Sequence, residues 1–264
     1  MLICGRPQMM SIAHSMDEIV PLFREAGFDG FEFCIEDKLF HVRPDLLEDY
    51  CADHMAALAC DNGLTVSAIG CHVDFVGNDD VYNVIKKGIA KTRRFGTDVF
   101  IIASGARSET PDGGYAELVR RLRGMLDIAA ASGVRLALEP EPGHRIDTTA
   151  SFLRLVEDLD GDPAMCCNFD IGHSHLLDPD IPSSIDSLGG RIVHGHIENM
   201  GDVHRHLVPW EGDIDLAAVL RALAAAGFDG ALAFDFYNDL YRELMPRVAS
   251  YLKELVAKTL LSTM

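Results

Sequence analysis

Short apolar runs alternate with longer stretches of mixed apolar and charged residues from one end of the chain to the other. The runs are rich in Val, Ile, Leu and Phe, and they have the length of buried strands. Eight of them are predicted as strands, at residues 2–4, 30–35, 65–71, 98–103, 134–139, 165–171, 191–197 and 230–236. So regular an alternation is typical of βα units that build a parallel sheet.

The stretches between these strands carry apolar residues at helical spacing. Helices are predicted at residues 16–26, 44–62, 79–95, 115–132, 148–160, 213–226 and 240–258. The segment 176–190, between the sixth and seventh strands, is poor in helical periodicity, and no helix is predicted there. Four helices are each followed by a glycine, where a left-handed residue ends a helix at least cost: Gly27, Gly63, Gly133 and Gly227.

One connector between a helix and a strand occurs twice. Glu25-Ala-Gly-Phe-Asp-Gly30 precedes the second strand, and Ala225-Ala-Gly-Phe-Asp-Gly230 precedes the eighth. This recurrence is expected if both connectors lie at the same face of a closed, repetitive barrel. No Pro- or Ser-rich linker or change in composition divides the chain. We therefore predict an α/β protein with a single (β/α)₈ barrel domain over residues 1–264.

The charge balance narrows the range of partners. Lys and Arg number 23 and Asp and Glu 41, so the net charge is −18. A surface this acidic repels phosphodiester backbones and anionic lipids, which argues against a nucleic-acid or membrane partner. The seven cysteines form no C-x-x-C pair and lie in apolar segments, so they are interpreted as reduced core residues. With no signal peptide and no apolar run long enough for a membrane span, a cytoplasmic protein is expected.

In a (β/α)₈ barrel, catalytic groups come from the C-terminal ends of the strands. Glu139 ends the apolar fifth strand, where an unpaired carboxylate would be costly unless it is paired or metal-bound. Asp170 ends the sixth strand, and Gly172 lets the chain turn sharply and present His173 to the same cavity. His175, two residues further, is expected in a loop. The alternative for Glu139 is an acid that supports other ligands or caps a helix, and for Asp170 it is a helix cap.

Two histidines and one acid stand at the last two strands. His194 and His196 are two residues apart and point to the same face of the seventh strand, so one can bind a metal and the other support it. Asp235 lies between two phenylalanines near the end of the eighth strand. Inward projection would place it beside the other acids. Three carboxylates with one imidazole suit Mn²⁺, Mg²⁺, Co²⁺ or Fe²⁺ better than a cysteine-rich zinc site.

The same segments carry a family resemblance that spans nearly the whole chain. The sequence resembles the xylose isomerase-like TIM-barrel superfamily, and in particular its sugar phosphate isomerase/epimerase branch. The strings that carry it are Gly-Phe-Asp-Gly-Phe-Glu-Phe33, Leu-Ala-Leu-Glu-Pro140, Phe-Asp-Ile-Gly-His173, His-Gly-His-Ile-Glu-Asn199 and Trp210-Glu-Gly-Asp-Ile-Asp215. These strings are fairly specific for the superfamily, but they do not indicate which substrate the protein acts on.

The resemblance implies a divalent metal ion held by Glu139, Asp170, His196 and Asp235, with His173 touching substrate. Mn²⁺ is expected first, with Mg²⁺, Co²⁺, Fe²⁺ or Zn²⁺ as alternatives. It also implies that the acids on the fifth and eighth strands, Glu139 and Asp235, move a proton through a cis-enediolate. The metal stabilises negative charge on the sugar oxygens, and a carboxylate on each face lets a proton leave one side and return on the other.

The sequence departs from the family pattern at two positions, Asp235 and Asp202. The eighth-strand acid is usually Glu, and Asp235 is one methylene shorter, which puts its role as a second base in question. The position six residues after His196, often an Arg that grips substrate, is Asp202, so a phosphate clamp at that point is absent.

Further side chains are candidates for contacting substrate near the cavity mouth. His72 would either reach the cavity or cap the third strand, and Glu141 would be either solvated or on the substrate side. His204, Arg205 and His206 would contact a sugar hydroxyl, act as proton donors or merely belong to a loop, and His144 and Arg145 are equally ambiguous. Trp210 would either cover the site or brace a loop.

These residues and the family resemblance predict a metal-dependent isomerase or epimerase that acts on a small ketose or polyol-type substrate. The expected partner is a small carbohydrate, and a homo-oligomer is an expected form of assembly. The alternative is a metal-dependent lyase on the same scaffold, of the inosose or dehydroshikimate dehydratase type or a carbon-glycoside-cleaving enzyme. An abasic-site endonuclease needs a further histidine at the end of the fourth strand, which ends Ile102-Ala-Ser-Gly105 here. A non-catalytic binding protein would require the acidic ligands to be coincidental.

Overall fold

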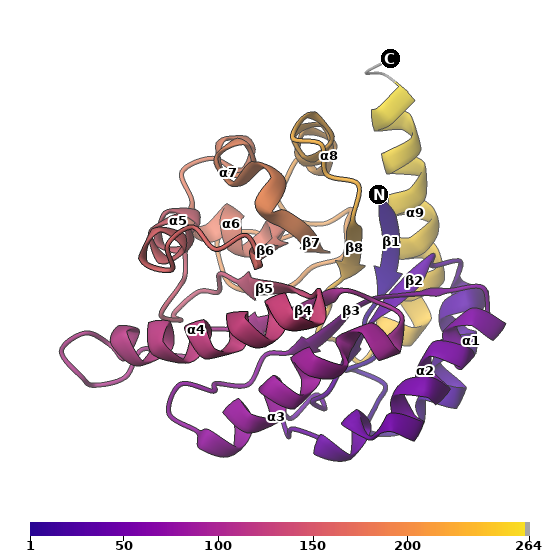
Figure 1. Ribbon diagram of the computed structural model, residues 1–264. Coiled ribbons are helices and arrows are strands. Elements are labelled where there is room, and N and C mark those ends of the chain that lie inside the picture. The colour runs from indigo at the N-terminus through magenta and orange to yellow at the C-terminus, as the bar shows by residue number, and fades with distance from the viewer. Residues whose placement is uncertain (262–264) are drawn as a thin grey trace.

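Eight parallel strands close into a barrel in the computed structural model, which describes residues 1–261 (Figure 1). The strands pair in chain order, and β1 closes the barrel by pairing with β8. They are β1 (Leu2–Gly5), β2 (Gly30–Cys34), β3 (Thr65–Cys71), β4 (Val99–Ala103), β5 (Arg135–Glu139), β6 (Met165–Asp170), β7 (Ile192–Ile197) and β8 (Ala231–Phe234). The predicted (β/α)₈ barrel is confirmed, and each predicted strand end lies within two residues of the observed one.

Helices surround the barrel and cover the outer face of the sheet (Figure 1). They are α1 (Met16–Ala26), α2 (Asp49–Asp61), α3 (Asp79–Lys91), α4 (Tyr115–Ser132), α5 (Thr149–Asp158), α6 (Ile171–Leu177), α7 (Ile181–Leu188), α8 (Leu216–Ala225) and α9 (Tyr241–Leu261). Short 3₁₀ turns, at Pro44–Leu47, Thr92–Phe95 and Gly189–Arg191, adjoin α2, α3 and α7. The single helices predicted at 44–62 and 79–95 are therefore each divided into a 3₁₀ turn and an α-helix.

The prediction was wrong between β6 and β7. Residues 176–190 were expected to lack helix, but α6 and α7 occupy most of the connection. Both helices are short and depend on their caps, because the side chains of Asp170 and Asp180 accept hydrogen bonds from the backbone N–H groups of His173 and Ser183. His175 accordingly lies in α6 rather than in a loop, and Gly172 is a helical residue rather than a sharp turn.

The glycine caps and the repeated connector behave as predicted. Gly27, Gly63, Gly133 and Gly227 all adopt positive φ angles, between 62° and 89°. The two copies of the connector lead into β2 and β8, which pair with β1 on its two sides. The repetition therefore marks equivalent positions around the closed barrel.

The interior of the barrel changes character along its axis. Small and medium apolar residues fill one layer, formed by Ala68, Val99, Ile101, Ala137, Cys166 and Val193. Glu139 follows Ala137 by two residues on β5 and so faces the same interior, one layer nearer the C-terminal end. The larger apolar core lies between the sheet and the helices. Glu139 therefore lies above this apolar layer, at the end of the barrel where the strands finish.

The structure also bears on the expectations for the cysteines and for membrane-spanning helices. The cysteines are all free, but Cys60 is exposed and Cys51 half-buried on α2, so these two are not core residues. Within residues 1–261, no helix combines the length and the apolar character needed to span a membrane.

Candidate active site

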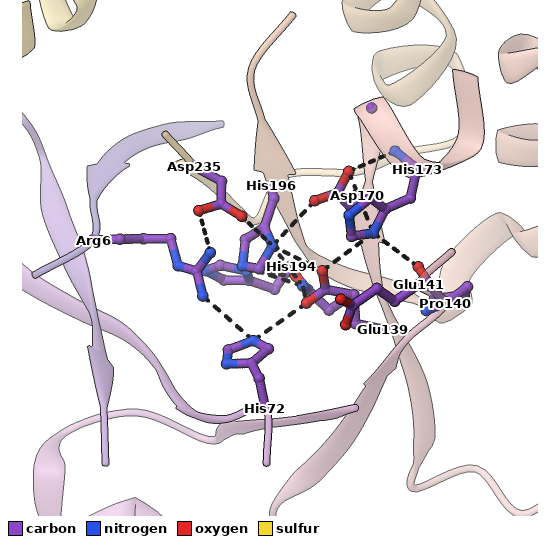
Figure 2. A network of polar contacts seen from close by, with 12 residues as sticks. Arg6, His72, Glu139, Pro140, Glu141, Asp170, His173, His194, His196 and Asp235 are labelled. Atoms are coloured by element: carbon purple, nitrogen blue, oxygen red, sulfur yellow. Dashed lines mark hydrogen bonds and ion pairs between the residues drawn. The ribbon is translucent and has the colours of Figure 1, made fainter. Parts of the chain in front are cut away.

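A cavity of about 370 Å³ opens at the C-terminal ends of the strands. Eight of the predicted site residues line it: His72, Glu139, Glu141, His173, His204, Arg205, His206 and Asp235. Arg6, Phe40 and Tyr237 complete the wall. Asp170 and His196 are buried beside these residues, so the structure brings the predicted catalytic, metal-binding and substrate-contacting side chains to one place. Figure 2 shows His72, Glu139, Glu141, Asp170, His173, His196 and Asp235 around this cavity.

Three carboxylates surround one nitrogen of His196 at the floor of the cavity. The distances from its Nδ1 are 3.3 Å to Glu139 Oε1, 3.5 Å to Asp170 Oδ2 and 3.8 Å to Asp235 Oδ2. The other ring nitrogen, Nε2, lies 2.8 Å from Glu32 Oε2. A proton on Nε2 donated to Glu32 leaves Nδ1 directed at the three acids. Burial lowers the pKa of His196 and Arg6 opposes its protonation, but the acids Glu139 and Glu32 raise this pKa well above its ordinary value.

Asp170 performs two tasks with its two oxygens. Oδ1 accepts a 2.8 Å hydrogen bond from the backbone N–H of His173 and so caps α6. Oδ2 is buried and has no hydrogen-bond partner within the described residues. The helix cap considered for this residue is therefore observed, and its second oxygen faces the site without a hydrogen-bond partner.

Glu139 is held by a neutral group from the adjacent strand β6 and by a basic group that follows β3. Its Oε2 accepts a hydrogen bond of 2.9 Å from the Asn168 amide and lies 3.3 Å from His72 Nε2. Burial raises the pKa of Glu139, but His196 and His72 outweigh burial and hold it well below its ordinary value. The carboxylate is therefore ionised at neutral pH.

His194 lies one layer deeper than His196 and supports the site indirectly. Its Nδ1 is 2.8 Å from Asn168 Oδ1 and its Nε2 is 3.2 Å from Ser67 Oγ. Burial lowers its pKa to about 3, so the ring is neutral. The histidine pair thus divides as predicted for neighbours on one strand face, with His196 among the acids and His194 holding Asn168, which in turn holds Glu139.

Asp235 reaches the cavity, but one of its oxygens is already paired. Arg6, which follows β1, places Nη1 2.5 Å from Asp235 Oδ1 and Nη2 3.2 Å from Glu32 Oε1 (Figure 2). The second oxygen, Oδ2, faces His196 and lies 3.7 Å from His206 Nδ1. Asp235 therefore keeps a single oxygen for a ligand or substrate.

His72 connects two buried acids. Its Nδ1 lies 2.7 Å from Glu36 Oε1, and its Nε2 faces Glu139. Burial lowers the pKa of His72, but Glu36 and the hydrogen bond to Glu139 raise it to about 10. The ring is therefore positively charged at neutral pH and stabilises the ionised form of Glu139.

The mouth of the cavity is formed by α6 and the loop after β7. His173 Nδ1 lies 3.1 Å from the Pro140 carbonyl oxygen, and its Nε2 lies 3.1 Å from His204 Nε2. Burial and the neighbouring Glu139 raise the pKa of Glu141 to about 7, so this acid can change protonation state near neutral pH. Arg205 also lines the mouth.

A divalent metal ion fits the donor set at the floor. Ligand atoms of Glu139, Asp170 and His196 lie within 4.8 Å of one another, and the Asp170 oxygen lacks a donor. The Glu32 carboxylate behind His196 is the kind of partner that orients a metal-binding imidazole. Oxygen-rich sets with one imidazole suit Mn²⁺ and similar ions.

Two of the residues with ambiguous roles, Arg145 and Trp210, serve structural purposes. The guanidinium of Arg145 is bound by Asp74 and by backbone carbonyls of Ser104 and Gly113. Trp210 packs against Arg247 and Tyr251 of α9, so it braces its loop. His144 lies 3.4 Å from Glu141 and is not among the residues lining the cavity.

Sequence reasoning missed Arg6, Asn168 and Glu198. Arg6 comes just after the first strand, and nothing in its local sequence separates it from a surface arginine. Glu198 is fully buried beside α6, where its Oε1 accepts a hydrogen bond from the Gly172 N–H. Burial and the nearby Asp170 raise its pKa well above the ordinary value. Of the three residues, only Asn168 could have been noticed from the sequence, because it is a polar residue inside an otherwise apolar strand.

Comparisons with known proteins agree with this architecture. The model of the xylose isomerase-like TIM barrel family matches residues 20–255. A 3-dehydroshikimate dehydratase from Pseudomonas putida is 25% identical over 252 residues, 88% of this chain, and the match spans 38% of the dehydratase. An L-ribulose 3-epimerase from Mesorhizobium japonicum is 26% identical over 234 residues, covering 81% of this chain and 73% of the epimerase.

Among solved structures, the IolI protein with a bound zinc atom superimposes with a TM-score of 0.79 at 21% identity, over 98% of this chain and 99% of that one. At this identity the likeness shows a common fold.

Proposed function

Because this chain belongs to the xylose isomerase-like TIM barrel family, we propose that it is a divalent-metal-dependent epimerase or isomerase of a small ketose or polyol-type substrate. The observation that carries the proposal is the convergence of Glu139, Asp170 and Asp235 on His196 Nδ1, at distances of 3.3–3.8 Å. Arg6 pairs with Asp235 and His72 with Glu139, whereas the buried Asp170 Oδ2 has no hydrogen-bond partner among the described residues, and a bound cation would supply one. The three acids are also the groups needed to bind an ion and move a proton.

The residues that would hold the ion are Glu139, Asp170, His196 and the free oxygen of Asp235, with Mn²⁺ as the expected metal. When bound, a divalent ion stabilises negative charge that develops on substrate oxygens. Glu32 keeps His196 oriented and Asn168 keeps Glu139 oriented, so the chain supplies both ligands and their supports.

Proton transfer would belong to the two acids that line the cavity. Glu139 is ionised and takes a proton from the carbon next to the substrate carbonyl, which produces an enediolate. In an epimerisation Asp235 returns a proton to the opposite face. His72, positively charged beside Glu139, holds that carboxylate in place. His173, His204, His206, Arg205 and Glu141 are the groups positioned to contact hydroxyls at the mouth.

The Arg6–Asp235 ion pair favours a second candidate, a metal-dependent lyase. Arg6 lies 2.5 Å from one oxygen of Asp235, so only the second oxygen is free to carry a proton to or from substrate. Elimination needs one base and an acid for the leaving group, and His206, 3.7 Å from Asp235, is placed to be that acid. The two relatives bear the names of an epimerase and a dehydratase. Removal of a proton next to a carbonyl can lead either to an epimer or to loss of a leaving group.

The cysteines and the closed barrel also bear on the cellular location and the domain organisation of the protein. The seven free cysteines suit a reducing compartment, and the cytoplasm is the proposed location. A single catalytic domain is proposed for residues 1–264, of which the last three lie outside the described part.

The test is turnover of a substrate panel by Mn²⁺-loaded protein in D₂O. We expect deuterium to enter a ketose at the carbon next to the carbonyl, with formation of its epimer, detected by NMR. Glu139→Gln should abolish the exchange, and Glu25→Gln, on the exposed face of α1, should leave it unchanged. An unsaturated product with ultraviolet absorption from a cyclic hydroxyketone would establish the lyase instead. No exchange and no product from any member would contradict both.

A further inference from the structure

A second cavity, of about 590 Å³, lies outside the candidate active site. Its wall comes from the loop between β4 and α4, from the first residue of α4, and from the segment that runs from Arg145 into α5. It shares no lining residue with the cavity at the strand ends. The segment after β5 separates the two, since Glu141 lines the first cavity and Arg145 the second. A ligand in the second cavity would therefore occupy a place that the proposed reaction does not use.

The wall of the second cavity is positively charged. It carries three guanidinium groups and one carboxylate, which belong to Arg107, Arg145, Arg154 and Asp112. Such an excess of positive charge stands out in a chain whose net charge is −18. Both oxygens of Asp112 are engaged by its own loop and helix, because Oδ1 accepts a 2.9 Å hydrogen bond from the Thr110 hydroxyl and Oδ2 accepts one of 3.0 Å from the Ala116 N–H. The guanidinium groups are therefore the charged groups that remain to bind a ligand.

Arg145 is fixed in the wall before any ligand arrives. Its side chain is only 5% exposed. Nε donates to the Gly113 carbonyl at 3.0 Å, and Nη1 donates to Asp74 and to the Ser104 carbonyl. Nη2 has no hydrogen-bond acceptor among residues 1–261. A buried guanidinium with one free nitrogen at a cavity wall is a preorganised donor for an anionic ligand.

The other two arginines also keep free N–H groups. Arg107 donates from Nε to the His144 carbonyl and from Nη2 to Asp147, which leaves Nη1 without an acceptor in the described part of the chain. Arg154 lies 3.9 Å from Asp158, a separation too long for a hydrogen bond. The acids that neighbour the three arginines all lie outside the wall of the cavity. The charge that faces a ligand is thus positive.

We propose that the second cavity binds a phosphate monoester of a small organic molecule. Guanidinium groups match the oxygens of phosphate in geometry as well as in charge, and three of them suit a group with three terminal oxygens. The volume lies in the range of small-molecule sites, so an organic portion fits beside the phosphate. Pro111, Tyr115 and Ile146 supply an apolar part of the wall for that portion. The Arg154 guanidinium lies 5.9 Å from the centroid of the Tyr115 ring, which joins the charged and apolar parts.

The test is titration calorimetry of phenyl phosphate into metal-stripped protein, because removal of metal prevents the phosphate from binding an ion at the floor of the other cavity. We expect one site per chain, with inorganic phosphate and benzoate binding at least tenfold more weakly. Arg107→Gln and Arg154→Gln should each weaken phenyl phosphate binding about tenfold, the effect of losing one charge-assisted hydrogen bond. The same loss is expected in Mn²⁺-loaded protein.

Arg120→Gln is the matched control, since Arg120 is an exposed arginine of α4 that does not line the cavity. It should bind phenyl phosphate like wild type. Arg145 is left unchanged because its buried contacts also hold the loop between β4 and α4.

Three results would overturn the proposal. Wild type that fails to bind millimolar phenyl phosphate, or equal binding by Arg154→Gln and Arg120→Gln, would show that the arginines form no site. Benzoate that binds as tightly as phenyl phosphate would contradict the assignment to phosphate. Binding that is lost in Glu139→Gln and kept in Arg154→Gln would place the ligand in the cavity at the strand ends. The titration measures no turnover, so its failure is distinguishable from failure of the proposed function.

Discussion

Single side chains in this site carry out structural and chemical tasks at once. Asp170 caps α6 with one oxygen and leaves the other free beside His196. Asp235 is bound by Arg6 through one oxygen and faces the cavity with the other. Because each carboxylate is fixed by one oxygen, its second oxygen is oriented before any ligand arrives. Such preorganisation reduces the cost of arranging the site when a ligand binds.

Buried His194 predicts a pH-dependent stability. Its pKa is lowered to about 3 by burial, so the folded protein excludes a proton that the unfolded chain binds below about pH 6.5. The stability from this group is present above pH 6.5 and is lost as pH falls, by about 1.4 kcal/mol per pH unit. In urea unfolding of the metal-free protein, the stability advantage of wild type over His194→Gln should shrink by about 2 kcal/mol between pH 6.5 and 5.

If the difference in free energy of unfolding between wild type and His194→Gln stays constant over this pH range, His194 takes up a proton equally in the folded and unfolded states. Using the difference removes contributions of the other histidines, which are common to both proteins.

Asn168 is predicted to control metal affinity without touching the ion. It donates to Glu139 and accepts from His194, so its removal frees the Glu139 carboxylate to rotate. Loss of such a supporting group costs roughly 10- to 100-fold in metal affinity. Titration calorimetry with Mn²⁺ should show this weakening in Asn168→Ala, while Asn62→Ala at the end of α2 binds like wild type. Equal affinity in both variants would contradict the role given to Asn168.

Site residues could be predicted from the sequence where a reactive side chain stands at the end of an apolar strand. Glu139, Asp170 and His196 are polar groups at the ends of apolar strands, and barrel geometry brings strand ends together. Arg6 and Glu198 could not be found in this way, because their importance comes from partners far away in the chain. Arg6 contacts Asp235, and Glu198 contacts Gly172. Only the closed fold reveals such pairs.

Among the elements, α6 has the strongest influence on the site. It begins directly after β6, so the cap Asp170 and the mouth residue His173 are fixed by one turn of helix. Gly172 permits this arrangement, since a Cβ at that position would overlap Glu198 Oε1 and Met200 Cε. Both atoms are the ends of flexible but fully buried side chains, so an alanine at this position would force Glu198 and Met200 to repack.

Gly172→Ala should therefore destabilise the fold and the site together. Overpacking of this kind costs typically about 1–3 kcal/mol, measurable by urea unfolding, and the shift of α6 should also weaken Mn²⁺ binding. Gly190→Ala is the matched control, because a Cβ at Gly190 meets no atom within 4 Å. A Gly172→Ala protein with wild-type stability and affinity would show that α6 can move without cost.

The success of the sequence prediction differed between strands and short helices. Strands were found because each is a continuous buried run, such as Val99–Ala103. The helices α6 and α7 have only seven and eight residues, too few for a periodic pattern to stand out. Their caps, Asp170 and Asp180, were the available signal, and at Asp170 the same residue also served the functional interpretation.

At the scale of the whole molecule, barrel closure is what assembles the site. Arg6 follows β1 and Asp235 follows β8, and these strands pair to close the barrel. Glu139, Asp170 and His196 come from β5, β6 and β7, which are adjacent in the same sheet. Residues more than two hundred positions apart thus share one cavity. The net charge of −18 adds an acidic surface around it, which favours accumulation of divalent cations over anions.

The central claim is that Glu139, Asp170 and His196 form a metal centre, and Mn²⁺ stoichiometry tests it most directly. Wild-type protein and Glu139→Gln would be stripped of metal, dialysed against Mn²⁺ and measured by elemental analysis, with circular dichroism to confirm folding. We predict one Mn²⁺ per chain in wild type and none in Glu139→Gln. Wild type without Mn²⁺, or a folded Glu139→Gln protein that still binds one ion, would contradict the account.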